Sequence, residues 1–436
     1  MIRKCLLLLL ALVTMPVMAQ REKTVYIDSL HVAQCLALDS GQVAVPIQAD
    51  SDSIEETVLP DADLSNPWVS RLRRRMANVL DQNIFKTTHM GVMIWDLDDD
   101  VCVYRHDETQ RMRPASVMKC VTAISALDQL GCDYEFSTKL YYKGTIAEDS
   151  VLHGSLYVVG GMDPLLGSRN VQAFVDSLKH LGVQAITGDL LADKSMKDTR
   201  PMGSGWCWDD DDSNPNMSPL LYERKDMFMG ELRRRLQAAG IRVQGEVGEG
   251  LKPSGAHLVA DERHALTDVM TRMMKRSDNL HAESVFYQMA KSTGIRNAGA
   301  RQARLQVNKV IRKTGLNPSN YYIADGCGLS LYDYVSAEMV TRLLRLAYKD
   351  NAIYRALLPT MPIAGRDGTL QKRMRGTAAA DNVHAKTGTV TSVSSLAGYC
   401  TASNGHHLCF TIINQGAIHA WQVRTVQDQI CQIMCE

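Results

Sequence analysis

The chain has 436 residues, enough for two domains or one large one, and its hydrophobic fraction of 45% is ordinary for a globular protein. Its 48 Lys and Arg residues balance 48 Asp and Glu residues, so the formal net charge is zero. That balance gives no indication of a nucleic-acid partner or of binding to an anionic membrane surface.

Residues 1–19 have the pattern of a secretory signal peptide. Arg3 and Lys4 form its positive start, an apolar run covers 6–13, and Ala19 ends a small-residue cleavage site. The apolar run is too short for a permanent anchor, and no other stretch is long and apolar enough for a membrane helix. We therefore expect an exported protein with no integral membrane segment after cleavage.

The next segments are a linker and the first regular elements. Residues 20–65 mix Asp, Ser, Gln and Pro with little periodicity, which indicates a linker. A helix is predicted at 67–82, followed by strands at 90–97 and 101–104. Three aspartates at 98–100 form the turn between these strands, and a solvated hairpin tip explains them better than a metal site.

A buried helix at 116–130 carries the first chemically informative pair. Pro114 precedes the helix and Gly131 suits its C-terminal end. Ser116 and Lys119 are three residues apart, so both lie on one face of the first turn. A buried lysine loses proton affinity and can act as a base, which would activate the serine hydroxyl as a nucleophile. Alone, this S-x-x-K pattern is weak, because about one is expected by chance.

Residues 136–260 differ in texture from what precedes them. Short strand-like runs alternate with helical patterns at about 170–182 and 224–239, and the loop at 203–219 is rich in Gly, Asp, Asn, Pro and Trp. We interpret this block as a smaller α/β domain inserted into the first one. The chain is then divided into a signal peptide at 1–19, a linker at 20–65, a main domain formed by 66–135 and 261–436, and the insertion at 136–260.

Two further motifs complete a pattern with Ser116 and Lys119. Ser277-Asp278-Asn279 lies within a helical pattern at 264–291, either as a solvated turn or as a short kinked connection facing a cleft. Lys-Thr-Gly occurs twice. Lys313-Thr314-Gly315 ends a helix predicted at 298–313, where the lysine and the glycine suit a helix C-terminus, so this copy is interpreted as structural.

The second copy, at 386–388, lies in a strand-like context. Lys386, Thr387, Gly388 and Thr389 could line the edge of a strand beside a cleft, where Gly388 allows an extended peptide to approach closely. Lys386 and the two threonine hydroxyls would hold a terminal carboxylate. Helices are predicted at 336–348, 350–358 and 420–435, and strands at 383–386, 393–401 and 406–413. Strands from both chain ends around a helical middle indicate an α+β fold, with an antiparallel sheet flanked by helices.

S-x-x-K, S-D-N and K-T-G in this order form the signature of the penicillin-recognising serine acyltransferases. Other segments resemble the class C low-molecular-mass penicillin-binding proteins, the D-alanyl-D-alanine carboxypeptidase/endopeptidase family of the penicillin-binding protein 4 type. The segments are G-G-M-D-P at 160–164, G-W-C-W-D-D at 205–210, D-G-C-G-L-S at 325–330, L-P-T-M-P-I-A-G-R-D-G-T-L at 358–370 and A-K-T-G-T-V at 385–390. In the third of these, Cys327 stands where the family has a serine.

The resemblance implies a DD-peptidase-like transpeptidase fold of the serine β-lactamase kind and a location in the bacterial periplasm. The implied substrates are stem peptides and cross-links of peptidoglycan, and β-lactams would bind covalently. The implied catalytic residues are Ser116 as nucleophile, Lys119 as base, and Ser277, Asn279 and Lys386 along the walls of the cleft. Thr387, Gly388, Thr389, Trp206 and Asp209 would contact substrate, although Trp206 has packing as its alternative. The backbone N–H groups of Ser116 and Thr389 would form the oxyanion hole.

The chain also departs from this family, and other functions compete. Ser116 and Ser277 are only 161 residues apart, so a third domain found in larger members is expected to be missing. A class A β-lactamase would need an E-x-x-L-N loop between Asn279 and Lys386, and none is present. A catalytically weak protein that binds cell-wall peptide is the other alternative.

Ten cysteines remain after the signal, which contains Cys5. Their scattered spacing, without C-x-x-C, gives no zinc site or redox pair, and we predict no metal or cofactor. We expect mostly buried small hydrophobic side chains, with room for one or two disulfides.

Overall fold

The structure, a computed structural model, describes residues 57–207 and 214–436, which belong to one compact unit at 54–436. The predicted signal peptide, most of the predicted linker and Asp209 lie outside the described residues. None of the helices in the described part combines the length and the apolar character needed to cross a bilayer.

A five-stranded antiparallel sheet joins the two ends of the described chain, as predicted. Its order is β10-β11-β12-β1-β2. The strands are β1 (His89–Asp96), β2 (Val101–His106), β10 (His384–Val390), β11 (Val393–Thr401) and β12 (His407–Gln415). The prediction ended the strand of the second K-T-G copy at 386, whereas β10 continues through the whole motif to Val390.

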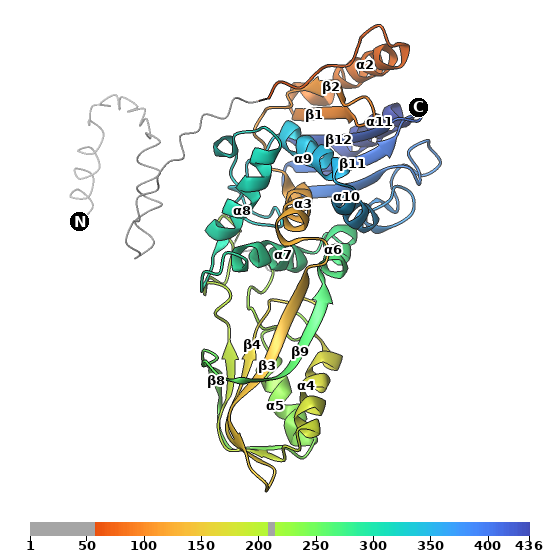
Figure 1. Ribbon diagram of the computed structural model, residues 1–436. Coiled ribbons are helices and arrows are strands. Elements are labelled where there is room, and N and C mark those ends of the chain that lie inside the picture. Colours follow the sequence, from red (N-terminus) through yellow and green to blue (C-terminus); the bar gives the residue numbers. More distant parts are fainter. Residues whose placement is uncertain (1–56, 208–213) are drawn as a thin grey trace, which may run out of the picture. The chain divides into compact units, whose positions relative to one another are not determined.

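Helices cover both faces of this sheet (Figure 1). In β1, Val92 and Ile94 pack in the cluster that includes α2 (Pro67–Leu80) and α11 (Ala420–Cys435). Met93 and Trp95 belong to the opposite cluster. Successive strand residues point to opposite faces, so a strand buried on both sides is apolar throughout. The opposite cluster contains residues of α3 (Met118–Leu130), α8 (Ala300–Lys313), α9 (Ala337–Lys349) and α10 (Asn351–Leu357).

The helical pattern predicted at 264–291 forms two helices, α6 (Leu266–Lys275) and α7 (Asn279–Lys291). Between them, Ser277 has a φ of 57°, in the left-handed region that stops an α-helix. Asp278 caps α7 by accepting the backbone N–H of His281. The S-D-N motif is therefore a kinked connection between helices, one of the two alternatives left open by the sequence. Within the described residues, five short 3₁₀ helices occur at 83–86, 115–117, 318–320, 358–360 and 368–370.

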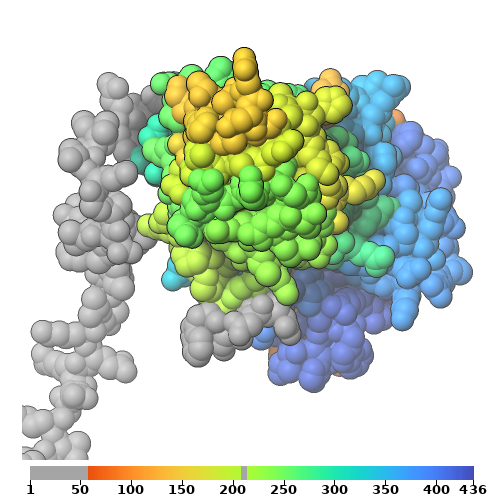
Figure 2. All heavy atoms as spheres, turned by 90° about the horizontal axis from the view of Figure 1, so that it is seen from below, coloured from red at the N-terminus to blue at the C-terminus, as the bar shows by residue number. Residues whose placement is uncertain are grey.

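A second, seven-stranded sheet with α4 (Ser168–His180) and α5 (Phe228–Ala238) has its own hydrophobic cluster. Its strands are β3 (Glu135–Ile146), β4 (Val151–Val159), β5 (Ala185–Ile186), β6 (Leu190–Asp193), β7 (Arg242–Val243), β8 (Val247–Glu249) and β9 (His257–Ala265). These elements form the near face in Figure 2, in yellow and green. The separate core supports an inserted domain at 136–260, whose boundaries stay a prediction.

Candidate active site

Ser116 and Lys119 form a hydrogen-bonded pair at the start of α3. Ser116 lies in the 3₁₀ turn Ala115–Val117 that precedes the helix. The Lys119 side chain is completely buried, and its Nζ lies 2.8 Å from Ser116 Oγ. Nζ also lies 2.8 Å from Asn279 Oδ1 and 2.8 Å from the carbonyl oxygen of Cys327.

This set of contacts suits a neutral amine. A neutral lysine has two N–H donors, which Asn279 Oδ1 and the Cys327 carbonyl can accept, and one lone pair, which can accept the Ser116 hydroxyl. Burial lowers the pKa of Lys119, and it outweighs the opposing influence of Cys327, Asp325 and Glu283. The arrangement can therefore take the serine proton during nucleophilic attack.

Lys386 is the second buried lysine of the site. Its Nζ donates to Ser277 Oγ at 2.9 Å and to the carbonyl oxygen of Thr387. Burial is the leading cause that holds the pKa of Lys386 well below its usual range, and a charge on Lys119 would lower it further. The hydrogen-bond partners of Lys119 are Ser116, Asn279 and the Cys327 carbonyl, whereas Ser277 is bound by Lys386.

The second K-T-G motif packs directly against the nucleophile turn. A Cβ atom on Gly388 would lie 2.1 Å from Ser395 Oγ, 2.8 Å from the Pro114 carbonyl oxygen and 3.0 Å from Ser116 N. Only glycine fits there without moving the backbone. The Thr387 hydroxyl bonds to the Thr369 hydroxyl at 2.7 Å, and Thr389 Oγ1 accepts from Arg424 at 2.9 Å.

The first K-T-G copy has a different environment. Lys313 ends α8, Thr314 is the C-cap and Gly315 has a φ of 78°. Lys313 is half-exposed, and its Nζ pairs with the carboxylate of Asp128 at 2.8 Å. This copy terminates a helix, as predicted.

The loop 325–330 contacts Lys119 through the carbonyl oxygen of Cys327, and this contact was not predicted from the sequence. The Asp325 carboxylate accepts the backbone N–H groups of Cys327, Gly328 and Ser330 at 3.1, 2.6 and 2.8 Å. These bonds fix the turn whose Cys327 carbonyl faces Lys119. A Cβ on Gly328, which has a φ of 84°, would lie 1.9 Å from the Ala115 carbonyl oxygen, so this loop also touches the nucleophile turn.

Trp206 helps to hold the loop 325–330 through Asp325. Its side chain is 8% exposed, and its Nε1–H donates to Asp325 Oδ2 at 2.7 Å. That position favours the packing alternative over a direct substrate contact. Its predicted neighbour Asp209 lies outside the described residues.

Asp278 links the S-D-N motif to the segment 136–260. Its carboxylate pairs with Arg224 at 2.7 Å and with Arg272 at 3.0 Å. Burial alone would raise the pKa of Asp278, but His281, Arg224 and Arg272 outweigh it and hold the pKa far below its usual range. Arg224 had no sequence signal, because the ion pair depends on how the two segments pack.

Two cavities meet at the nucleophile, and Ser116, Ser277 and Thr389 line both. One has a volume of about 660 Å³ and is also lined by Arg113, Cys207, Asn214, Asn279, Leu329, Leu331, 390–392, Ala417, Ile418 and Ala420. The other has a volume of about 490 Å³ and is also lined by Thr369, Lys372, Arg373, Thr387, Trp421, Arg424, Thr425 and Asp428. The predicted catalytic hydroxyls are therefore reachable from two sides.

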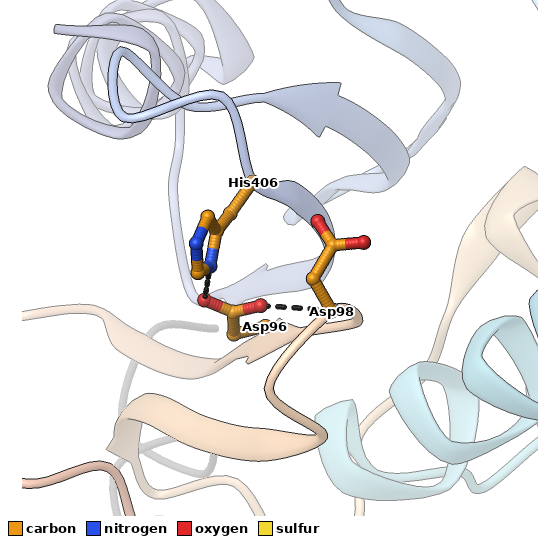
Figure 3. Close-up of side chains that lie close together, drawn as sticks. All are labelled: Asp96, Asp98 and His406. Carbon is orange, nitrogen blue, oxygen red and sulfur yellow. Dashed lines mark hydrogen bonds and ion pairs between the residues drawn. The ribbon is translucent and has the colours of Figure 1, made fainter.

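The acidic turn between β1 and β2 is engaged by neighbouring cations. Figure 3 shows His406 against Asp96, whose other oxygen accepts the backbone N–H of Asp98 at 3.0 Å. The hydrogen bond with Asp96 raises the pKa of His406 despite partial burial. Asp100 pairs with Arg345 and Lys349. These contacts tie the hairpin to the start of β12 and to α9.

All nine cysteines of the described residues are free. Cys207 is exposed and Cys132 is half-buried, whereas the others are buried, as expected for small hydrophobic side chains. The buried cysteines are Cys102, Cys120, Cys327, Cys400, Cys409, Cys431 and Cys435.

Comparison with known proteins gives consistent matches. The model of the D-Ala-D-Ala carboxypeptidase 3 (S13) family matches residues 72–222 and 220–436. The D-alanyl-D-alanine carboxypeptidase of Actinomadura sp. strain R39 is 27% identical over 454 residues, covering 81% of this chain and 83% of the relative. D-alanyl-D-alanine carboxypeptidase DacB of Haemophilus influenzae is 25% identical over 415 residues, covering 76% of this chain and 86% of the relative.

Solved structures show the same fold. The crystal structure of penicillin-binding protein 4 from Haemophilus influenzae superposes with a TM-score of 0.72 at 24% identity, covering 83% of this chain and 97% of that chain. Its complex with a β-lactam gives a TM-score of 0.66 at the same identity, with the same two coverages. The predicted DD-peptidase-like fold is thereby confirmed.

Proposed function

The chain belongs to the D-Ala-D-Ala carboxypeptidase 3 (S13) family, and we propose that Ser116 is the nucleophile of its serine DD-peptidase reaction. Membership makes the protein a serine D-alanyl-D-alanine carboxypeptidase, among the class C low-molecular-mass penicillin-binding proteins. The observation that carries the assignment of Ser116 is its 2.8 Å contact with the buried amine of Lys119.

In the proposed reaction, Ser116 Oγ attacks the carbonyl carbon of the terminal D-Ala-D-Ala bond while Lys119 accepts the hydroxyl proton. Ser277, held by Lys386, relays a proton to the leaving amine, and D-alanine departs. Water then hydrolyses the acyl-enzyme at Ser116. A cross-link would be cleaved in the same way, with a longer leaving group, which makes endopeptidase activity part of the proposal.

The substrate would lie along β10, between Thr387 and Thr389. The close approach of Gly388 to Ser116 N supports an oxyanion hole formed by the backbone N–H groups of Ser116 and Thr389. Asn279, whose Oδ1 is engaged by Lys119, would orient this lysine as well as the substrate amide.

The proposed setting is the periplasm, with peptidoglycan stem peptides as substrates and penicillin as a covalent inhibitor. The missing E-x-x-L-N loop supports a long-lived penicillin adduct rather than β-lactamase activity. A missing third domain is supported by the Actinomadura alignment. It has 454 positions but uses 81% of 436 residues, about 353, so about 100 positions have no counterpart here.

Fluorescent penicillin and D-alanine release test this function together. The wild-type protein should become labelled covalently and should release D-alanine from a stem pentapeptide, and Ser116→Ala should lose both activities. Labelling that persists in Ser116→Ala would place the nucleophile elsewhere. Rapid penicillin turnover by the wild type would instead favour the β-lactamase alternative, and binding of peptide without D-alanine release would favour a binding protein.

A further inference from the structure

The smaller cavity beside Ser116 has one wall made by α11. Trp421, Arg424, Thr425 and Asp428 line it from this helix, opposite Thr387 and Thr389 of β10. The helix is fixed to the sheet one turn beyond Arg424, where the buried Gln427 amide donates to Asn414 Oδ1 at 3.0 Å. Arg424 is therefore presented to the cavity by a rigid element.

The charge of Arg424 has no carboxylate partner among residues 57–207 and 214–436. Its guanidinium donates to Thr389 Oγ1 at 2.9 Å, and its side chain is exposed. The neighbouring Arg373 differs, because Asp428 pairs with it at 2.7 Å. A charged arginine that faces a cavity and holds only a hydroxyl retains donors for an incoming anion.

From the K-T-G pattern, Lys386 and the hydroxyls of Thr387 and Thr389 were predicted to bind a terminal carboxylate. In the structure, the Lys386 side chain is completely buried and its amine holds Ser277 and the Thr387 carbonyl. A carboxylate that enters the smaller cavity meets Arg424 beside the Thr389 hydroxyl, not the amine of Lys386.

We infer that Arg424 is a substrate-binding residue that pairs with the free carboxylate of the leaving D-alanine. This inference rests on the proposed function, in which the leaving group lies along β10 next to Thr389. Arg424 and Thr389 together would read the charged end of the peptide, because a D-alanine leaving group offers only a methyl side chain for other contacts. Arg424 on α11 would then determine the preference for a substrate with a free terminal carboxylate over one whose carboxylate is blocked.

The test compares a stem peptide that ends in D-Ala-D-Ala with the same peptide ending in a carboxamide. In Arg424→Gln, kcat/KM for the free acid should fall about 10- to 100-fold, the usual loss for one charge-assisted contact, while the amide should change less than about twofold. Arg424→Lys should recover part of the loss. Arg75→Gln is the matched control, because Arg75 pairs with Glu436 at the far end of α11.

Three results would overturn the inference. The two substrates could lose activity equally in Arg424→Gln, the acid could be cleaved at the wild-type rate, or Arg75→Gln could show the same selective loss. A wild-type protein that releases no D-alanine from either substrate would overturn the proposed function, and the inference with it. Thermal midpoints of all variants separate a binding defect from unfolding.

Discussion

At the scale of single residues, the hydrogen-bond capacity of Lys119 decides how the site can work. As an ammonium ion, Lys119 would donate to all three partners, Ser116, Asn279 and the Cys327 carbonyl, and could not accept a proton. As a neutral amine it satisfies two acceptors and keeps a lone pair for Ser116. Burial favours the neutral form, since a charged amine loses its hydration there.

The rate of acylation by penicillin should therefore fall as the pH drops through the lowered pKa of Lys119, because protonation removes the base. Stopped-flow acylation rates measured across pH give this profile. Lys119→Met, which keeps the length of the side chain, should lose nearly all acylation at every pH. Acylation by Lys119→Met at close to the wild-type rate would contradict the assignment of the base.

Glu283 offers a pH test of stability rather than activity. Burial, with the charge of Asp325, raises the pKa of Glu283 from 4.5 to about 8. Between these values the folded state holds a proton that the unfolded state releases. Unfolding free energy should therefore fall as pH rises through this window, by up to ~1.4 kcal/mol per pH unit.

Glu283→Gln imitates the protonated acid and still offers an oxygen to the Gly326 N–H, which Glu283 binds at 2.8 Å. Urea midpoints between pH 5 and 8.5 should fall less steeply for this variant than for the wild type. Glu148→Gln, at an exposed turn, is the control and should keep the wild-type slope. Equal slopes for all three proteins would contradict the raised pKa.

Some residues of the site could be predicted from sequence and others could not, for a physical reason. Ser116 and Lys119 share one helical turn, so their contact follows from spacing alone. The contacts of Lys119 with Asn279 and Cys327 join residues that lie 160 and 208 positions away. Such contacts are decided by how α7 and the loop 325–330 pack against α3, which a local pattern does not encode.

At the scale of elements, the same limit explains the break between α6 and α7. Apolar residues keep a helical period on both sides of Ser277, so periodicity alone continues one helix through 264–291. The left-handed φ of Ser277 and the capping by Asp278 interrupt it. The strands β1, β2, β11 and β12 were predictable, because each contains a short apolar run next to turn residues. The strand predicted at 383–386 stopped short of Val390, because the rest of β10 is mostly polar.

The two K-T-G copies have the same sequence but lie on different elements, one at the end of α8 and one on β10, so they test whether location determines the role of the lysine. Lys386→Met should lower kcat/KM by ~30- to 1,000-fold, or ~2 to 4 kcal/mol, because Ser277 loses the hydrogen-bond donor that holds it from β10. Lys313→Met should lose only its half-exposed ion pair with Asp128 and a dipole contact, ~0.3 to 1 kcal/mol of stability, with catalysis unchanged. D-alanine release and thermal midpoints of both variants check this. A catalytically dead Lys313→Met would mean that the functional motif was placed on the wrong element.

At the scale of the whole described unit, the segment 136–260 is connected to the site through several polar contacts, two of which involve side chains that bind site carboxylates. Arg224 binds the Asp278 carboxylate next to Ser277, and Trp206 binds the Asp325 carboxylate, which organises the loop behind Lys119. We therefore predict that the insertion contributes to catalysis by positioning these carboxylates, whether or not it touches substrate. Sequence alone predicted an inserted block from its change in texture, but not these contacts.

Trp206→Phe tests this positioning role, because phenylalanine keeps most of the packing but cannot donate to Asp325. Without that donor the loop 325–330 should hold the Cys327 carbonyl less firmly, and kcat should fall about tenfold, equivalent to ~1.4 kcal/mol, with KM little changed. The pH profile of acylation should also shift, because a less organised Asp325 alters the electrostatic potential at Lys119.

Trp68→Phe, in the core between α2 and the sheet, is the matched control and should lower only the thermal midpoint. If Trp206→Phe instead raises KM with kcat and the pH profile unchanged, Trp206 contacts the substrate directly and the positioning role is wrong.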